Sequence, residues 1–193
     1  METNLITKSF EESVEVKKEF FSAENIALVE RTALEIVASF KAGGKLITAG
    51  NGGSAADAQH LAAELVNRFE IERPPLPALA ITTDTSNITS IGNDYSFDEV
   101  FSKQIRALGR DKDVFLAIST SGASPNITKA AEAARTMGLK VIALTGKGGG
   151  ELGARADIVI NVEAKRTCRV QEVHIIVIHI LCELIDCMLF KNV

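Results

Sequence analysis

Two pairs of polar side chains in this sequence have the residue types and the spacing to carry out chemistry. His60 and Glu64 stand four positions apart in AGNGGSAADAQHLAAEL, residues 49–65, which places both on one face of a helix. Gln171 and His179 lie eight positions apart in an apolar segment near the C-terminus, about two helical turns. Such groups can bind zinc, and a Glu with a His can also move a proton between adjacent carbons of a sugar. From the residues alone, zinc binding and proton transfer are both possible, and each histidine could instead be a hydrogen-bonded residue of the core.

A third histidine shares the apolar segment with His179. His174 lies five positions before His179 and therefore on a different side of the helix. The two imidazoles cannot both point into one small site, so we expect only one of them there.

A glycine-rich loop comes directly before the helix of His60. Gly50 to Ser54, with Asn51, Gly52 and Gly53 between them, follow a short apolar run. Glycines let the backbone turn sharply and approach a ligand closely. The spacing matches neither the dinucleotide fingerprint nor the Walker A loop. The loop is therefore either a ligand-binding loop or a tight turn.

A second loop is crowded with hydroxyl groups. Ser119, Thr120, Ser121 and Ser124 precede Pro125, a residue typical of the first position of a helix. A helix N-terminus with added hydroxyl donors favours a phosphate monoester. The alternative is a capped helix whose serines face water.

Two further loop segments carry weaker signals. Asn93 and Asp94 could hydrogen-bond a polyol, although such a pair is commonly a turn. The glycine run 146–150 lacks the order of a P-loop, so we expect a flexible turn.

The elements that must position these residues follow from the hydrophobic pattern. Short apolar runs alternate with helical segments, which predicts a parallel sheet covered on both faces. In such sheets ligands bind beyond the carboxyl ends of the strands. We expect one domain over residues 1–193, with a helical extension over about 1–42 and a long C-terminal helix over about 168–190. The predicted strands are 45–49, 78–82, 113–119, 140–145 and 157–162.

Composition limits the classes of partner. The 193 residues are 46% hydrophobic and 24% charged with a net charge of −4, so the chain is expected to be globular and not to bind nucleic acid. The three cysteines, Cys168, Cys182 and Cys187, form no CxxC motif, which favours a reducing cytoplasm. The apolar C-terminal run contains His, Glu and Asp residues, so we expect a buried helix and no membrane span.

The ordered motifs GNGGSAADAQHLAAEL, IGNDYSFDEVFSKQ, ISTSGASPN, LTGKGGG and RVQEVHIIVIHIL resemble the sugar isomerase (SIS) domain and, within it, the bacterial phosphoheptose isomerases. The resemblance covers the chain from the second helix onward. It implies a three-layer α/β/α sandwich of flavodoxin-like character around a central parallel five-stranded sheet, preceded by N-terminal helices. It also implies a homotetramer with active sites between subunits.

The activity implied by the resemblance is an aldose–ketose isomerisation. Sedoheptulose 7-phosphate would be converted through an enediol into D-glycero-D-manno-heptose 7-phosphate, a precursor of the lipopolysaccharide core or of other surface glycans. Glu64 and His179 match the family's acid/base pair, with the choice of base left open. Its zinc ligands match His60, Glu64, Gln171 and His179. Its substrate-binding pattern matches Asn51, Gly52, Gly53, Glu64, Asn93, Asp94, Ser119, Thr120, Ser121, Ser124 and Gln171.

Two alternatives belong to the same family. The DnaA initiator-associating protein is a SIS tetramer that acts as a non-catalytic scaffold in replication initiation, and NRFEIERPPLPALA and KQIRALG resemble it as well. That relative lacks the helix Glu and the final His, so Glu64 and His179 favour the enzyme. SIS proteins that act on or sense other sugar phosphates are larger or have two domains, which the short chain disfavours.

Overall fold

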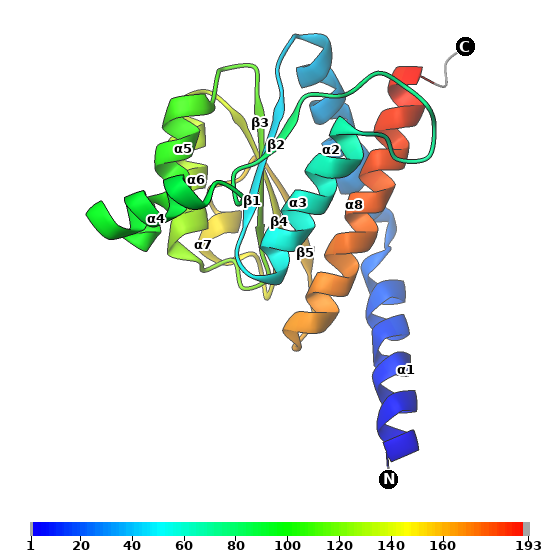
Figure 1. Ribbon diagram of the computed structural model, residues 1–193. Coiled ribbons are helices and arrows are strands. Elements are labelled where there is room, and N and C mark those ends of the chain that lie inside the picture. The colour runs from blue at the N-terminus through cyan, green and yellow to red at the C-terminus, as the bar shows by residue number, and fades with distance from the viewer. Residues whose placement is uncertain (1, 191–193) are drawn as a thin grey trace.

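The computed structural model describes residues 2–190, a central sheet with helices on both sides (Figure 1). Every predicted strand is present, and each begins within one residue of its expected start. The second is shorter than expected, because the chain turns at Thr82. Residues 1 and 191–193 of the predicted domain lie outside the described residues. The strands are β1 (Leu46–Gly50), β2 (Ala78–Ala80), β3 (Val114–Ser119), β4 (Lys140–Gly146) and β5 (Ile158–Val162).

The strand order places two of the predicted loops side by side. The five strands are parallel in the order β2-β1-β3-β4-β5. The chain goes from β1 to one side for β2 and returns to the other side for β3, so the direction of winding reverses between β1 and β3. In an open parallel sheet this switch point is where ligands bind. The glycine-rich loop follows β1 and the serine loop follows β3, so both open at the switch point.

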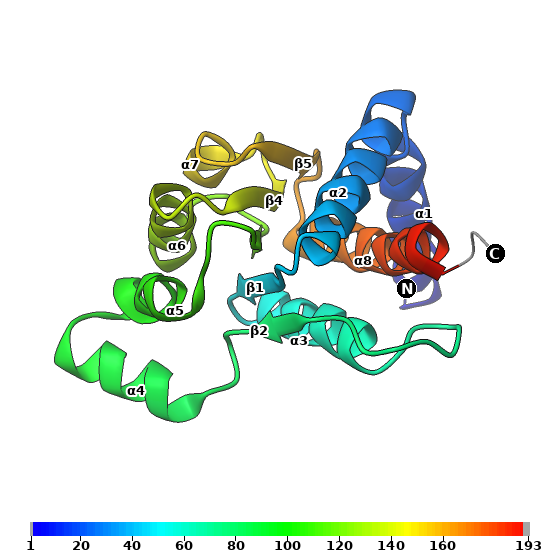
Figure 2. The same ribbon diagram turned by 90° about the horizontal axis from the view of Figure 1, so that it is seen from above.

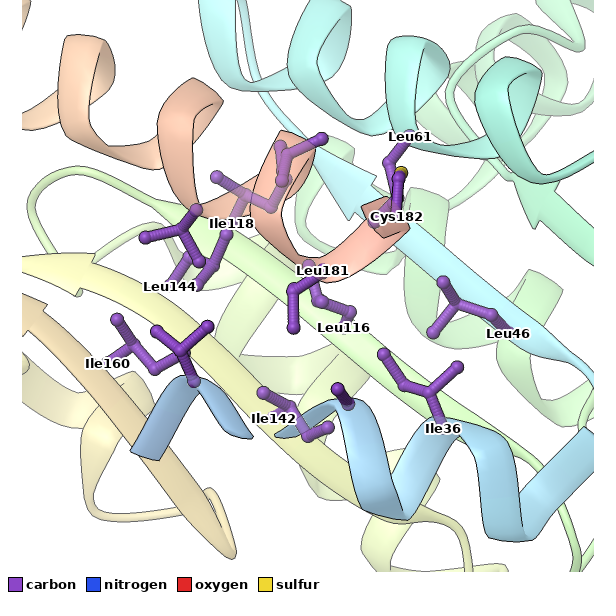
Figure 3. Packing of buried hydrophobic residues seen from close by; sticks show 14 of the residues in the cluster. Ile36, Leu46, Leu61, Leu116, Ile118, Ile142, Leu144, Ile160, Leu181 and Cys182 are labelled. Atoms are coloured by element: carbon purple, nitrogen blue, oxygen red, sulfur yellow. The ribbon is translucent and has the colours of Figure 1, made fainter. Parts of the chain in front are cut away.

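Helices cover both faces of the sheet (Figure 2), and the core consists of two layers of apolar side chains, one on each face. Leu116 and Ile118 of β3 face α2 (Ala23–Lys41), α3 (Gly53–Val66) and α8 (Thr167–Phe190), as Figure 3 shows. Phe115 and Ala117 face α5 (Val100–Leu108), α6 (Pro125–Thr136) and α7 (Gly150–Gly153). Successive residues of a strand point to opposite faces. The predicted three-layer α/β/α fold is confirmed.

Two elements lie at the periphery of this sandwich. The N-terminal α1 (Glu2–Phe20) runs beyond the sheet and is joined to α8 through hydrogen bonds of Arg169 with Ser9 and Glu12. The helical extension is divided after Phe20, and Ser22 caps α2 by accepting a hydrogen bond from the Asn25 amide. On the opposite side, α4 (Thr85–Asp94) and the 3₁₀ helix η1 (Phe97–Glu99) lie beside α5, and α4 has no buried residue.

The C-terminal helix α8 meets the length and hydropathy criteria for a membrane span. Its best window has a mean hydropathy of 2.1 and is 44% buried. Val173, Val177 and Leu181 are fully buried against the sheet and its covering helices. A helix that is packed between a sheet and other helices is apolar on most of its sides. The helix α8 occupies such a position in the fold.

Candidate active site

The glycine-rich loop lets α8 approach the start of α3. Gly52 adopts φ 54° and ψ −121°, a conformation that L side chains rarely adopt. A Cβ atom on Gly53 would lie 2.1 Å from Nε2 of Gln171. The absence of a side chain at Gly53 therefore makes room for the Gln171 amide, which lies against the first turn of α3.

Two turns further along both helices, two histidines meet. The Nε2 atoms of His60 and His179 are 2.9 Å apart, and a Glu64 carboxylate oxygen lies 3.6 Å from Nε2 of His60. The Phe69 ring stacks on His179 with 5.8 Å between the ring centroids. Residues 60, 64, 171 and 179 thus line one seam between α3 and α8, within a single chain.

A buried carboxylate adjoins this seam. Asp57 is 7% exposed, and its Oδ2 atom has no hydrogen-bond partner in the described part of the chain. Burial raises the pKa of Asp57, while a hydrogen bond with Gln171 and the charge of His60 act in the opposite direction. Asp57 therefore links the Gln171 amide to the histidine pair.

The serine loop forms a compact cluster of hydroxyl groups. Ser119 Oγ lies 3.1 Å from Ser124 Oγ and 3.5 Å from Ser121 Oγ. Ser124 is the N-cap residue of α6 and Pro125 its first residue, as predicted, but the Ser124 hydroxyl faces Ser119 and does not cap the helix. The cluster lies at the N-terminus of α6, where free N–H groups favour an anion.

Neighbouring loops fix the serine loop in place. Gly122 has φ +63°, and a Cβ atom there would lie 2.1 Å from the Gly149 carbonyl oxygen. The Leu152 amide donates to the Gly122 carbonyl. The predicted flexible turn at 146–150 is thus packed against the serine loop. A Cβ on Gly146 would also meet Thr120 O and Val170, so Gly146 allows the serine loop to approach α8.

A reciprocal amide pair joins the glycine-rich loop to the serine loop. Asn51 and Asn126 exchange two side-chain hydrogen bonds of 2.8 and 2.9 Å. Asn126 lies in the first turn of α6 and is 2% exposed. The pair spans the switch point between β1 and β3, so the two loops form one continuous rim.

The third histidine lies away from the seam. His174 is fully buried, and one ring nitrogen lies 3.0 Å from the Thr145 carbonyl oxygen. Burial lowers the pKa of His174 to about 4, against the effect of that hydrogen bond. His174 is therefore a neutral side chain that joins α8 to β4, and only His179 enters the seam.

Asn93 and Asp94 are not brought to these residues within the chain. They end α4, are exposed, and hydrogen-bond each other at 2.8 Å. The helix lies against α5 and η1 and projects away from α3 and α8 (Figure 2). Within this chain, Asn93 and Asp94 are therefore separate from the seam.

The donor types at the seam fit a zinc ion in their chemistry. No group of three or more His, Cys, Asp or Glu side chains within residues 2–190 already has a metal-binding arrangement. His60 and His179 nevertheless direct two imidazole nitrogens at one point, with a Glu64 oxygen beside them. Zinc prefers imidazole and carboxylate donors. The Gln171 amide, whose oxygen is a further donor, lies on the same seam.

Three residues at the site were not predicted from the sequence. Asp57 stands one turn before His60 on α3, and this helical spacing could have predicted that the two side chains share a face of the helix. Phe69 and Asn126 carried none, because their contacts with His179 and Asn51 join segments far apart in the chain.

Comparisons with known proteins identify close relatives. A profile of the SIS domain family matches residues 9–146. The chain is 56% identical over 188 residues to a phosphoheptose isomerase of Aromatoleum aromaticum, covering 95% of this chain and 94% of the relative. It also resembles the solved phosphoheptose isomerases of Neisseria gonorrhoeae (44% identity, TM-score 0.89, 96% and 99% of the two chains) and Francisella tularensis (42% identity, TM-score 0.91, 96% and 98%).

Proposed function

Because this chain belongs to the phosphoheptose isomerase family of SIS domain proteins, we propose that it interconverts sedoheptulose 7-phosphate and D-glycero-D-manno-heptose 7-phosphate. The product supplies heptose for lipopolysaccharide core or another surface glycan. The observation that carries the proposal is the meeting of Glu64, His60 and His179 at the seam, next to a serine loop suited to a phosphate.

Binding begins with the phosphate. The hydroxyls of Ser119, Ser121 and Ser124 and the N-terminus of α6 hold the 7-phosphate, and Thr120 adds a fourth hydroxyl. The Asn51–Asn126 pair and Gly52–Gly53 then direct the sugar chain from this loop towards the seam. Tethering by the phosphate converts proton transfer into a step between groups already in place.

The reaction needs one proton removed and one returned. Glu64 or His179 takes the proton from C1 of the ketose, which gives an enediol, and the other group helps return a proton at C2. The Gln171 amide, held by Gly53 and Asp57, lies where it can hydrogen-bond a sugar hydroxyl or carbonyl. His60 and Phe69 orient the His179 ring from two sides.

A zinc ion is the proposed cofactor, with one ion per subunit. Its ligands would come from His60, Glu64, Gln171 and His179, and when bound it would supply a Lewis acid for the substrate carbonyl. The donor chemistry at the seam supports this assignment.

The proposed working unit is a homotetramer in the cytoplasm, with active sites between subunits. Leu5, Ile6 and Phe10 of α1 are 69–71% exposed, and α4 has no buried residue. Such apolar and unpacked surfaces favour contact with further copies. Three free cysteines support a reducing compartment. Light scattering of the purified protein measures the subunit number.

Neither the contacts at the seam nor the relatives named above favour the scaffold alternative. The relatives named above are isomerases, and a scaffold has no chemical need for His60, Glu64 and His179 to meet. The proposed reaction is therefore the function that this geometry supports best.

The test is an assay with sedoheptulose 7-phosphate in D₂O followed by NMR. We expect the aldose 7-phosphate to form with deuterium at C2, as an enediol that exchanges with solvent requires. Sedoheptulose without phosphate is the matched control and should react far more slowly. Folded protein that leaves the phosphorylated ketose unchanged would refute the proposal.

A further inference from the structure

A buried arginine lies between the two helices of the seam and has no role in the chemistry described so far. Arg73 belongs to the segment 67–77 that connects α3 to β2, and its side chain is 1% exposed. Its Nε atom lies 2.7 Å from Oδ1 of Asp186 on α8, whose side chain is 3% exposed. Removing one partner from such a pair leaves a buried charge uncompensated.

The rest of the guanidinium completes the C-terminus of α3. Nη2 donates to the Glu64 carbonyl at 2.9 Å, and Nη1 donates to the Leu65 carbonyl at 2.8 Å. The last carbonyls of a helix have no partner within it. The planar fork of arginine can serve several acceptors at once, and lysine cannot reproduce it. Arg73 thus fixes the backbone of the residue that carries the seam carboxylate.

The same side chain fixes α8. Asp186 follows His179 by seven positions, about two turns further along the same face. Between them lies Cys182, which is fully buried. Burial raises the pKa of the Cys182 thiol to about 12, and the charges of Glu64 and Asp186 act in the same direction. Glu64, Cys182 and Asp186 are therefore neighbours along the seam, and Arg73 closes its end.

The connecting segment also reaches the acid/base pair. Phe69, four positions before Arg73, stacks on the His179 ring. Arg73 holds this segment near α3 through its hydrogen bonds with the Glu64 and Leu65 carbonyls. One side chain thus contacts the end of α3 and α8, and it belongs to the segment that carries Phe69.

We propose that Arg73 is a positioning residue for the isomerisation, holding Glu64 and His179 at the separation that proton transfer requires by joining the end of α3 to Asp186. This inference rests on the proposed function. Its rival is a purely structural ion pair, whose loss would lower stability without changing the geometry of the seam.

A double substitution separates the two. Arg73→Met alone leaves Asp186 buried and unpaired, whereas Arg73→Met with Asp186→Leu replaces the pair by apolar groups, which is often neutral for stability. The double variant still lacks the donors to Glu64 and Leu65. We expect its melting temperature to return towards that of the wild type while kcat stays about 100-fold lower and KM changes little, since misplacement of reacting groups by about 1 Å costs that much.

The matched controls break comparable contacts elsewhere. Arg155→Met removes an arginine that follows α7, donates to the Glu151 carbonyl and pairs with the Glu151 carboxylate. Lys45→Met breaks the ion pair with Asp113, which joins the residues just before β1 and β3. Both should keep the wild-type kcat even where they lower the melting temperature. A double variant with wild-type kcat overturns the inference, and so does one in which only KM rises.

A readout without turnover keeps the inference separate from the proposed function. In a Cys168→Ser, Cys187→Ser background, which removes the two exposed thiols, a maleimide reports only on Cys182. We expect faster labelling of Cys182 in the double variant than in the background protein, because the seam opens. If the wild type proves inactive, the proposed function fails, and labelling alone decides: equal rates overturn the positioning role.

Discussion

The Nε2 atoms of His60 and His179 lie 2.9 Å apart, although the two residues are separated by 119 positions in the chain. At that distance the two nitrogens form a hydrogen bond, in which one ring donates a proton to the other. Phe69 on one side and Glu64 on the other restrict the rings further. We therefore propose that proton transfer and metal binding take place at the seam between α3 and α8.

The first prediction concerns the acid/base pair. Glu64→Gln keeps the size of the side chain but removes the base, and His179→Ala removes the imidazole. We expect kcat to fall by about 10²- to 10⁴-fold in each, while the oligomer seen by light scattering is unchanged. Glu183→Gln, an exposed carboxylate on the same helix as His179, is the control. Full activity in either seam variant would show that the assignment is wrong.

The second prediction concerns the serine loop. Ser124→Ala removes a hydroxyl that lies 3.1 Å from Ser119 Oγ. A hydrogen bond to a charged phosphate contributes about 1.5–3 kcal/mol, so kcat/KM should fall by about 10- to 100-fold, mainly through KM. Thr136→Ala, at the far end of α6 with its hydroxyl on the Glu132 carbonyl, should leave both constants unchanged. An unchanged KM in Ser124→Ala argues against phosphate binding at this loop.

The third prediction concerns the metal. Elemental analysis of the native protein should find about one zinc per subunit, in line with a site of mixed imidazole and carboxylate donors. Chelation should abolish activity, and added zinc should restore it. His60→Ala should lower the zinc content, because His60 supplies one of the two facing imidazoles. Activity that survives complete removal of zinc would exclude the metal from the reaction and leave the proton-transfer scheme intact.

The fourth prediction concerns pH and stability. Burial lowers the pKa of His174 from 6.5 to about 4, so the unfolded chain binds a proton at higher pH than the native protein does. The contribution of neutral His174 to the free energy of unfolding is therefore complete above pH 6.5 and is lost as the pH falls towards about 4. The free energy of unfolding should decrease there by up to about 1.4 kcal/mol per pH unit.

Chemical denaturation at several pH values measures this slope, and His174→Gln should have a shallower one. Should the variant fail to fold, NMR titration of the His174 ring in the wild type measures the pKa of this side chain directly. A ring that titrates near its ordinary pKa would contradict the prediction.

The parts of the fold that local pattern encodes were predicted correctly. Five apolar runs became five parallel strands, because a strand buried on both faces must be apolar along its length. The spacing of His60 and Glu64 gave their common face, since it depends only on helix geometry. The serine loop could be located for the same local reason: Pro125 and the preceding hydroxyls mark a helix start.

The contacts that complete the site were not predictable in this way. Asn126 reads as an ordinary residue in the first turn of a helix, and only the neighbouring positions of β1 and β3 bring it to Asn51. Arg73 reads as a charged loop residue, yet it is nearly fully buried because α8 places Asp186 beside it. Asn93 and Asp94 illustrate the reverse: they lie within resembling motifs, but α4 carries them away from the seam.

The sequence by itself determined the strands, the helices and the chemical types at the site, since periodicity and spacing act over a few residues. Only the tertiary structure decided that α3 and α8 meet along Glu64, His60 and His179. That meeting depends on the strand order and on which apolar faces pack together, and these interactions join segments more than a hundred residues apart. No local pattern encodes them, because their free energy comes from surfaces that exist only once the sheet has formed.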